Sequence, residues 1–567
     1  MHAGARRLAI GLLGAAGIAT LVVATSAADP TVRFSNVATA NTKSPGYDPP
    51  NILSPQLQEV EWARGAMAVE NPGSGIKAYG YDDDGSPFVP VIAAGTNGGN
   101  LTVSGGRHPE AQKTEPDKNT YLVLKGQHGA DPAYNYGTHF LFQGHEAGSP
   151  GYITRINLDA DGKHRVTLLA TQDVNGSKLP TIDGSTWDPW AQQLLFTSEA
   201  GPSGGVSQGG VWQSTLGGKV VNLQRSIGRA GMEGIQNDDQ GNLYIEEDVG
   251  GGSLFAAPDN RARVPNSFVF RVIPNDAGDL TKGGKIQALQ VLDQNGNPIT
   301  QTVANSGVAP APYVQLHTYG TKLKTKWITI VANSGTAATD PDDAALARVA
   351  GATPFKRPEN GLFQPGSKFK DYYFDETGDT NADITAADAS VGGFGSLFHL
   401  TQSPTSDNGA IELFYLGDAT HAAFDNVAFF GGTQLAAVED RGDTLHGQTA
   451  LDSAWLYDTT ANYARPTNQP IRFIAEGRDP SATLDSAISG VYGTLFPAPP
   501  PNPPGFYNDG DNEITGIHVS DGDPTKDGVL GAKLPKPFQG NGRWRAFWTQ
   551  QHGDNVTYEL IARSNDD

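Results

Sequence analysis

One hairpin pattern recurs along the sequence at irregular intervals, and this recurrence constrains the fold more than any other feature. In each copy an acidic residue precedes a short apolar strand, a turn follows, and a second strand ends at an acidic or histidine-containing corner. Residues 138–146 are the hairpin of one copy, and five more begin at Asp183, Glu233, Glu359, Asp425 and Glu513. A common hairpin with irregular spacing is typical of a β-propeller with loop insertions. The sequence therefore predicts an all-β, six-bladed propeller.

The composition agrees with a strand-rich fold that has few short helices. The 567 residues include 70 glycines and 38 prolines, which favours many turns and long loops. The clearest helix runs from Asp340 to Val349. Asp340 suits the N-cap, and Gly351 ends the helix. Its apolar stripe would comprise Ala344, Leu346 and Val349.

Residues 1–28 are predicted to be a signal peptide, because Arg6 and Arg7 precede an apolar run and a group of small residues. The paired arginines favour the twin-arginine route and a secreted, periplasmic or cell-surface protein. A single-pass anchor is the alternative, although the apolar run is at the short end of the spanning range. No later stretch can span a membrane. We expect residues 29–567 to form one monomeric propeller domain, in which the segment 29–110 has no assignable pattern.

The acidic residues of the hairpins are predicted to meet. In a propeller the innermost strand of each blade lines the central axis, so polar residues at the same end of those strands face one funnel. The converging set would comprise Glu146, Glu199, Glu233, Glu359, Asp425 or Asp440, and Glu513. The alternative is a set of unrelated turn carboxylates, but turns favour Asp and Asn rather than Glu.

Arg357 and Glu359 lie on either side of Pro358 at the predicted entrance of a strand. Proline disfavours the helical region for the residue before it, so Arg357 is expected on extended backbone. An arginine and a glutamate presented together can bind an anion and a metal at one place. A surface ion pair near a turn is the simpler alternative.

The available donor groups favour hard cations. The chain contains no cysteine, which excludes thiolate nucleophiles and Cys-ligated metals. A ring of carboxylates suits calcium, magnesium, manganese or ferric iron. Two or more such cations would bind phosphate, and Arg357 would add a bidentate contact. The net charge of −21 argues against nucleic acid as a partner.

Two further features are less specific. His145 and His552 can serve as metal ligands or general acids, although a lone histidine is more often structural. Residues 521–528 resemble a calcium loop but lack the closing glutamate of an EF-hand. They are predicted to form an acidic hairpin turn or, as the alternative, a peripheral calcium site.

The motifs, taken in order, resemble those of the PhoX-type alkaline phosphatases. They are GHE at 144–146, a strand ending in SE at 198–199, GMEG at 231–234, ATPFKRPEN at 352–360, FDNVAF at 424–429, NEITGI at 512–517 and QHGD at 551–554. The resemblance covers roughly residues 120–554. It implies a six-bladed propeller that is exported by the twin-arginine route. It also implies a calcium- and iron-dependent phosphomonoesterase with metals in the axial funnel and a small phosphorylated substrate.

Position by position, the resemblance implies catalytic roles for Arg357 and Glu359, with Arg357 binding the phosphate. His552 resembles the histidine of the family's Q-H-P-G corner. The implied metal ligands are Glu146, Glu199, Glu233, Glu359, Asp425, Asn426, Asp440 and Glu513.

One position departs from the family pattern. Typical members have an iron-ligating cysteine in an N-C-A-G-G turn, whereas this chain has Thr181 within P-T-I-D-G. Calcium is therefore the expected cofactor, and the iron site is in doubt. We hypothesise that Asp183 offers an oxygen ligand instead. The second acid of the family's T-C-E-E strand end is also lost, to Ala200.

The leading interpretation is a secreted phosphatase that hydrolyses phosphate monoesters at a multi-metal carboxylate site. Two alternatives remain open. One is a calcium-stabilised propeller that binds a ligand without catalysis, and the other is a phytase-like or lactonase-like hydrolase with the same architecture.

Overall fold

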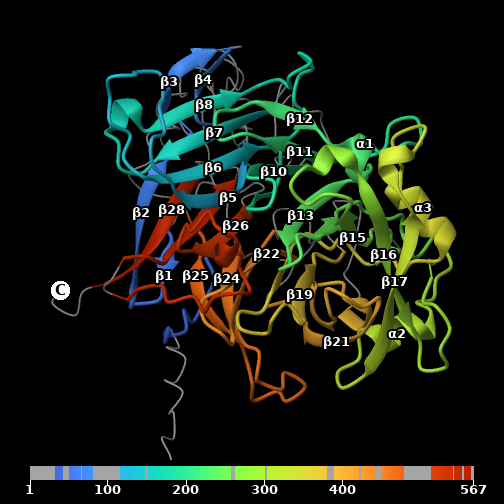
Figure 1. Cartoon of the computed structure of the whole chain (residues 1–567). Coiled ribbons are helices and arrows are strands. Elements are labelled where there is room, and N and C mark those ends of the chain that lie inside the picture. Colours follow the sequence, from blue (N-terminus) through green and yellow to red (C-terminus); the bar gives the residue numbers. More distant parts are fainter. Residues whose placement is uncertain are drawn as a thin grey trace, which may run out of the picture.

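The computed structural model (Figure 1) is described for a defined set of residues. The described ranges are 32–41, 50–65, 67–73, 75–80, 115–146, 151–256, 262–300, 303–379, 389–420, 423–440, 450–477, 513–539, 542–551 and 555–563. The predicted signal peptide, His552 and part of the segment 29–110 lie outside them.

The strands form six antiparallel blades, each with four or more strands. The first blade contains β5 (Pro116–Val123), β6 (His139–His145), β7 (Tyr152–Asn157) and β8 (Val166–Ala170). The second contains β9 (Ser185–Asp188), β10 (Gln193–Ser198), β11 (Gly210–Ser214) and β12 (Val220–Asn222). The third contains β13 (Met232–Asn237), β14 (Leu243–Glu247), β15 (Val269–Pro274), β16 (Gly284–Leu292) and β17 (Lys322–Val331). The strand β17 also pairs with β21, which joins the third and fourth blades at their outer edges.

Two of the remaining three blades, the fifth and the sixth, each include one strand from the N-terminal part of the chain. The fourth blade contains β18 (Gly361–Phe363), β19 (Asp371–Glu376), β20 (Ser396–Thr401) and β21 (Asn408–Leu416). The fifth contains β22 (Phe424–Phe429), β23 (Gln434–Glu439), β24 (Ser453–Asp458), β25 (Ile471–Ala475) and the N-terminal strand β1 (Ile52–Leu53). The sixth contains β26 (Glu513–Ser520), β27 (Arg545–Gln551), β28 (Val556–Ala562) and the N-terminal strand β2 (Leu57–Ala63). A separate hairpin, β3 (Ala68–Gly73) and β4 (Ile76–Ala78), contacts β8.

The first strand of each blade lies on the inside, and these inner strands close a ring. Contacts join β5 to β9, β9 to β13, β13 to β18, β18 to β22, β22 to β26, and β26 back to β5. In Figure 1 the C-terminal strands, drawn in red, lie between the blue strand β2 and the cyan strands of the first blade. The predicted six-bladed propeller is therefore confirmed.

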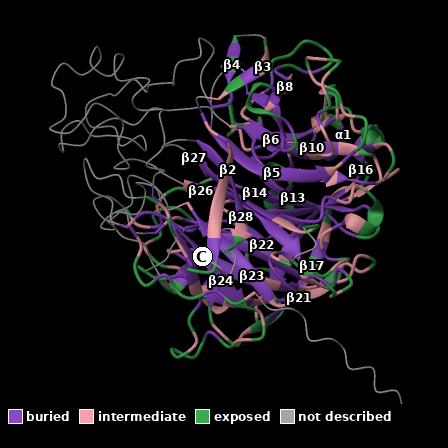
Figure 2. Cartoon of the chain, turned by 90° about the vertical axis from the view of Figure 1, so that its left-hand side faces the viewer, coloured by how far each residue is buried: buried purple, intermediate pink, exposed green. Residues whose placement is uncertain are grey.

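Part of the unassigned segment 29–110 completes the sixth blade. The strand β2 pairs with β28 from Leu57↔Ala562 to Ala63↔Thr557, so both ends of the chain contribute to the sixth blade. This pairing holds the N-terminal strand β2 to the C-terminal strand β28 within one blade. Figure 2 shows the buried strands at the centre and the exposed residues mainly in the surrounding loops.

Three short α-helices occur among the described residues: α1 (Gln224–Ile227), α2 (Ala311–Leu316) and α3 (Asp343–Ala350). Asp342, not Asp340, is the N-cap of α3, because its side chain accepts a hydrogen bond from Ala345 N at 3.0 Å. The helix ends as predicted at Gly351, which has a left-handed conformation. No helix in the described ranges has both the length and the apolar character that crossing a membrane requires.

The predicted apolar stripe of α3 was wrong in two of its three positions. Ala344 is buried, but Leu346 is 36% and Val349 is 88% exposed. The small residue Ala347 lies in the core instead. The helix thus packs closely through alanines, and a pattern based on the largest apolar residues misplaces its buried face.

Candidate metal centre

A cavity of about 130 Å³ lies where one end of the inner strands converges, and acidic residues dominate its lining. The lining residues are Asp117, Glu146, Asp183, Glu199, Glu233, Asp248, Arg357, Glu359, Asp425, Asp440, Glu513 and Thr515. They come from all six blades.

Antiparallel pairing explains why these acids meet. The start of an inner strand lies beside the end of the second strand in its blade, so acids at both positions reach the same end of the axis. In the third blade Met232 pairs with Glu247, which places Glu233 and Asp248 together. The same relation holds in the fifth blade, where Phe424 pairs with Glu439 and the next residues are Asp425 and Asp440.

A glycine lets two of these segments approach closely. Gly234 N donates to Glu359 O at 2.7 Å. A Cβ atom at this position would lie 2.5 Å from Glu359 O, so no other residue fits without displacing the segment. Gly234 in the GMEG motif therefore helps to bring Glu359 beside Glu233.

Seven of the lining acids form three linked triads. Within each triad the ligand oxygens lie within 4.8 Å of one another. The triads are Asp117, Glu146 and Asp183; Asp183, Glu199 and Glu233; and Glu233, Glu359 and Asp425. Because Asp183 and Glu233 each belong to two triads, the three positions form a continuous row.

Burial and mutual repulsion raise the pKa values of these carboxyl groups. Burial, and then the charge of Glu146, raises the pKa of Asp117 to about 8. Burial raises the pKa of Asp183 and Glu233 well above the usual range, and their acidic neighbours add to the effect. Without a cation, burial and repulsion therefore favour the protonated forms of Asp117, Asp183 and Glu233, with their protons in place. A bound cation would displace them.

One arginine, Arg357, lines the cavity together with the acidic residues. Its Nε and Nη2 donate to Oδ1 and Oδ2 of Asp248, each at 2.7 Å, and Nη2 also donates to Glu359 Oε1 at 2.9 Å. Burial lowers its pKa, but the charges of Asp248 and Glu359 outweigh burial, so the pKa is raised and the guanidinium stays charged. The backbone φ of Arg357 is 58°, so the predicted extended conformation was wrong.

A second polar layer supports the row. Lys118 Nζ donates to Asn360 Oδ1 at 2.9 Å, and Asn360 Nδ2 donates to Glu233 Oε1 at 3.1 Å. Lysine is only a donor, so it fixes which end of the amide faces Glu233. Asn360 N also donates to Asp375 Oδ1 at 2.7 Å. This layer orients Glu233, one of the two carboxylates that are shared between triads.

Most of the residues singled out in the sequence meet at this cavity. Those that line it are Glu146, Glu199, Glu233, Arg357, Glu359, Asp425, Asp440 and Glu513. Asn426 does not line it. Its Nδ2 donates to Thr515 O at 2.8 Å and to Asp425 Oδ1 at 3.2 Å. The individual roles of these residues stay predictions.

Three other residues considered in the sequence lie elsewhere. Thr181 is two residues before Asp183 and does not line the cavity. His145 is buried, with Nε2 2.9 Å from Thr154 Oγ1 and its ring stacked on Tyr152. That environment is structural. His552 lies outside the described residues.

Sequence reasoning missed two acids of the cavity, Asp117 and Asp248. Asp117 lies near the start of the inner strand β5, before the first hairpin pattern that the sequence shows. Asp248 follows β14 as Glu199 follows β10. The rule that an acid directly follows the second strand of a hairpin would therefore have identified Asp248 from the sequence.

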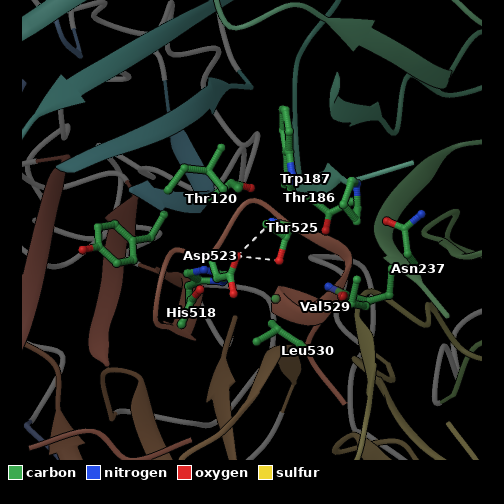
Figure 3. Close-up of a pocket in the computed structure, with 15 residues that line it drawn as sticks. Thr120, Thr186, Trp187, Asn237, His518, Asp523, Thr525, Val529 and Leu530 are labelled. Atoms are coloured by element: carbon green, nitrogen blue, oxygen red, sulfur yellow. Dashed lines mark hydrogen bonds between the residues drawn. The ribbon is translucent and has the colours of Figure 1, made fainter. Parts of the chain in front are cut away.

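A second, smaller cavity of about 40 Å³ lies elsewhere, lined in part by β5, β9, β13 and the loop after β26. Figure 3 shows Asp523 in this region, with hydrogen bonds to Thr525 N at 2.9 Å and Thr525 Oγ1 at 2.7 Å. Lys533 Nζ lies 3.0 Å from Asp521 Oδ2 and 2.5 Å from Asp523 Oδ2. The ammonium group of Lys533 thus bridges two acids of the loop 521–528.

Comparison with known proteins supports the fold. The structure is similar to that of Pseudomonas fluorescens PhoX in complex with vanadate, a transition state analogue. The TM-score is 0.51 at 11% sequence identity, and the match covers 93% of this chain and 98% of that one. A structure of S. cerevisiae Dbp5 bound to Nup159, Gle1, IP6 and ADP matches with a TM-score of only 0.28 at 8% identity, over 90% of this chain and 97% of that chain. No protein-family model and no curated protein matches the chain.

Proposed function

We propose that this protein is a metal-dependent phosphatase that hydrolyses phosphate monoesters at the carboxylate cavity. The observation that carries the proposal is the convergence of three linked carboxylate triads and one charged arginine on the same cavity. The similarity of the fold to PhoX, which was solved with a transition state analogue, supports it.

The donor set fits hard cations, because each triad offers only carboxylate oxygens. Asp183 Oδ1 is buried and has no hydrogen-bond partner among the described residues, which leaves it available as a ligand. Calcium suits such a set, and iron would have to be held without a thiolate since the chain has no cysteine. When bound, the cations would polarise a phosphoryl oxygen and offset its charge.

Arg357 would bind the substrate phosphate. Its guanidinium is planar and stays charged, and it would bind a phosphoryl oxygen by exchanging a hydrogen bond that it now donates to Asp248 or Glu359. Asp248 and Glu359 hold it at the edge of the row, and its Nη2 is 3.8 Å from Asp440 Oδ2. The cavity of about 130 Å³ suits a phosphate group of a small substrate.

The proposal is tested with two substitutions in the cavity, Arg357→Ala and Glu359→Gln. Both should reduce turnover of a phosphate monoester about 100- to 1,000-fold, as expected when a group that stabilises charge is lost, while circular dichroism shows an intact fold. Arg348→Ala, on α3 and outside the cavity lining, is the charge-matched control and should keep full turnover. Full activity in both cavity variants would refute the assignment.

A calcium-stabilised binding propeller is the second candidate, because no cysteine is present to hold iron. Such a protein would retain calcium, show no turnover with any added metal and keep its ligand binding after Arg357→Ala. Export through residues 1–28, a single domain over 29–567 and a monomeric state remain parts of the proposal.

A further inference from the structure

Arg357 has a backbone conformation that its sequence position does not favour. Its φ of 58° lies in the left-handed region, where a residue with a side chain is strained. The next residue is Pro358, so the chain here has little freedom to relax. A strained conformation persists only where neighbouring contacts fix it. The contacts around Arg357 therefore decide where its guanidinium lies.

The segment that follows β19 provides the backbone contacts. Thr377 N donates to Arg357 O at 2.8 Å, and Gly378 N donates to Lys356 O at 3.1 Å. These two consecutive hydrogen bonds hold the peptide groups on both sides of the strained residue. They tie the Arg357 segment to the end of β19.

Side chains reinforce the same contact. Lys356 Nζ pairs with Asp379 Oδ1 at 2.8 Å, and Lys356 N donates to Glu376 Oε1 at 2.8 Å. Glu376 is itself held by His317 Nε2 at 2.9 Å and by Tyr313 OH at 3.3 Å. We call Lys356, Glu376 and Asp379 the clamp.

The clamp is buried but does not line the cavity. The side chains of Lys356 and Asp379 are 1% and 0% exposed, and neither contributes to the cavity lining. A buried ion pair is weak evidence for stability, because the cost of removing both charges from water offsets their attraction. Fixing one conformation of the neighbouring residue is the role that this geometry supports.

We propose that Lys356 and Asp379 are positioning residues, which hold Arg357 in its left-handed conformation and direct its guanidinium to the carboxylate cavity. This inference rests on the proposed function, because Arg357 matters only if the cavity binds phosphate. It goes further by assigning a role to residues that touch neither cation nor phosphate.

The test is the double variant Lys356→Met/Asp379→Asn. It removes the ion pair without changing the net charge, and Asp379→Asn keeps an acceptor for Arg263 N, which now donates to Asp379 Oδ1 at 2.7 Å. We expect binding of inorganic phosphate, measured by calorimetry on the protein with its metals, and monoester turnover to fall about 10- to 100-fold. In an Arg357→Ala background the double variant should cause no further loss. Undiminished phosphate binding, or a full additional loss in that background, would overturn the inference.

Arg271→Met/Asp407→Asn is the matched control. It also removes an ion pair with a buried arginine, between groups that do not line the cavity, and it keeps the net charge. This variant should bind phosphate like the wild type.

Hydrogen exchange separates a failure of the clamp from a failure of the proposed function. The amides of Thr377 and Gly378 should exchange faster in Lys356→Met/Asp379→Asn than in the wild type, even in a protein that neither binds nor hydrolyses phosphate. Unchanged protection of both amides would refute the clamp. Faster exchange in a protein without phosphate binding would support the clamp and refute the phosphatase.

Discussion

Glu233→Gln should change the stability of the metal-free and calcium-bound protein in opposite directions. Glu233 belongs to two of the three triads, and burial and acidic neighbours raise its pKa. Without metal, folding has to protonate this buried acid, and the neutral amide of glutamine removes that cost. We expect the metal-free protein to gain about 1–3 kcal/mol, the usual cost of a poorly satisfied buried polar group.

With calcium, the same substitution replaces a charged carboxylate that two triads share with a neutral amide, which is a weaker calcium ligand. Partners that only orient a ligand are worth about 10- to 100-fold in affinity, so the loss of the ligand's charge is placed at about 100-fold. This reduces the stabilisation by bound calcium by about 2.7 kcal/mol per site. For 567 residues the unfolding entropy is about 1.2 kcal/mol/K, so each kcal/mol shifts Tm by about 0.8 °C. The loss is then about 4 °C for two sites.

The assay is thermal unfolding with a chelator and with excess calcium, at the same pH. Glu233→Gln should raise Tm by about 1–2 °C in chelator and reduce the calcium-induced rise in Tm. Glu247→Gln is the control. Glu247 is buried in the same blade, its pKa is raised by burial to about 8, and it accepts a hydrogen bond from Phe268 N outside the cavity. An undiminished calcium-induced rise for Glu233→Gln would refute the triads as metal sites.

Three further predictions concern pH and packing. In chelator, the free energy of unfolding should fall as the pH rises from about 4 to about 8. The reason is that burial raises the pKa of folded Asp117 to about 8, so the folded state binds more protons than the unfolded state in this window. Unfolding measured against pH with and without calcium checks this, and calcium should abolish the decline. Asp343 is fully buried, neither carboxylate oxygen has a hydrogen-bond partner among the described residues, and burial raises its pKa. Asp343→Asn should therefore stabilise the protein at pH 7 by about 1–3 kcal/mol in urea unfolding, and a loss of stability would contradict the argument. Ala347→Leu should destabilise the protein by about 1–3 kcal/mol through overpacking, whereas Val349→Leu, at an 88% exposed position, should change stability by less than about 0.5 kcal/mol.

The repeated hairpins were sufficient to predict the blades, since strand alternation and turns are local properties of the sequence. The convergence of Glu233, Glu359 and Asp425 followed from the fold, because the same end of every inner strand faces the axis. Asp117 was missed because a turn-like composition conceals an inner strand that only pairing with β6 reveals.

Local rules failed where distant contacts decide the conformation. The effect of Pro358 favours extended backbone at Arg357, but hydrogen bonds from Thr377 and Gly378 impose a left-handed conformation. The contacts of residue 356 with Asp379 are equally non-local. The sequence identifies which side chains suit the chemistry, whereas the contacts that hold those side chains in place depend on tertiary packing.

The most direct test of the central claim combines elemental analysis with a phosphomonoesterase assay on one sample of the purified protein. Our account predicts bound calcium and measurable turnover, with turnover lost when a chelator removes the metal and restored when calcium is returned. Calcium without turnover, even after iron or other metals are added, would contradict the phosphatase and favour the binding propeller.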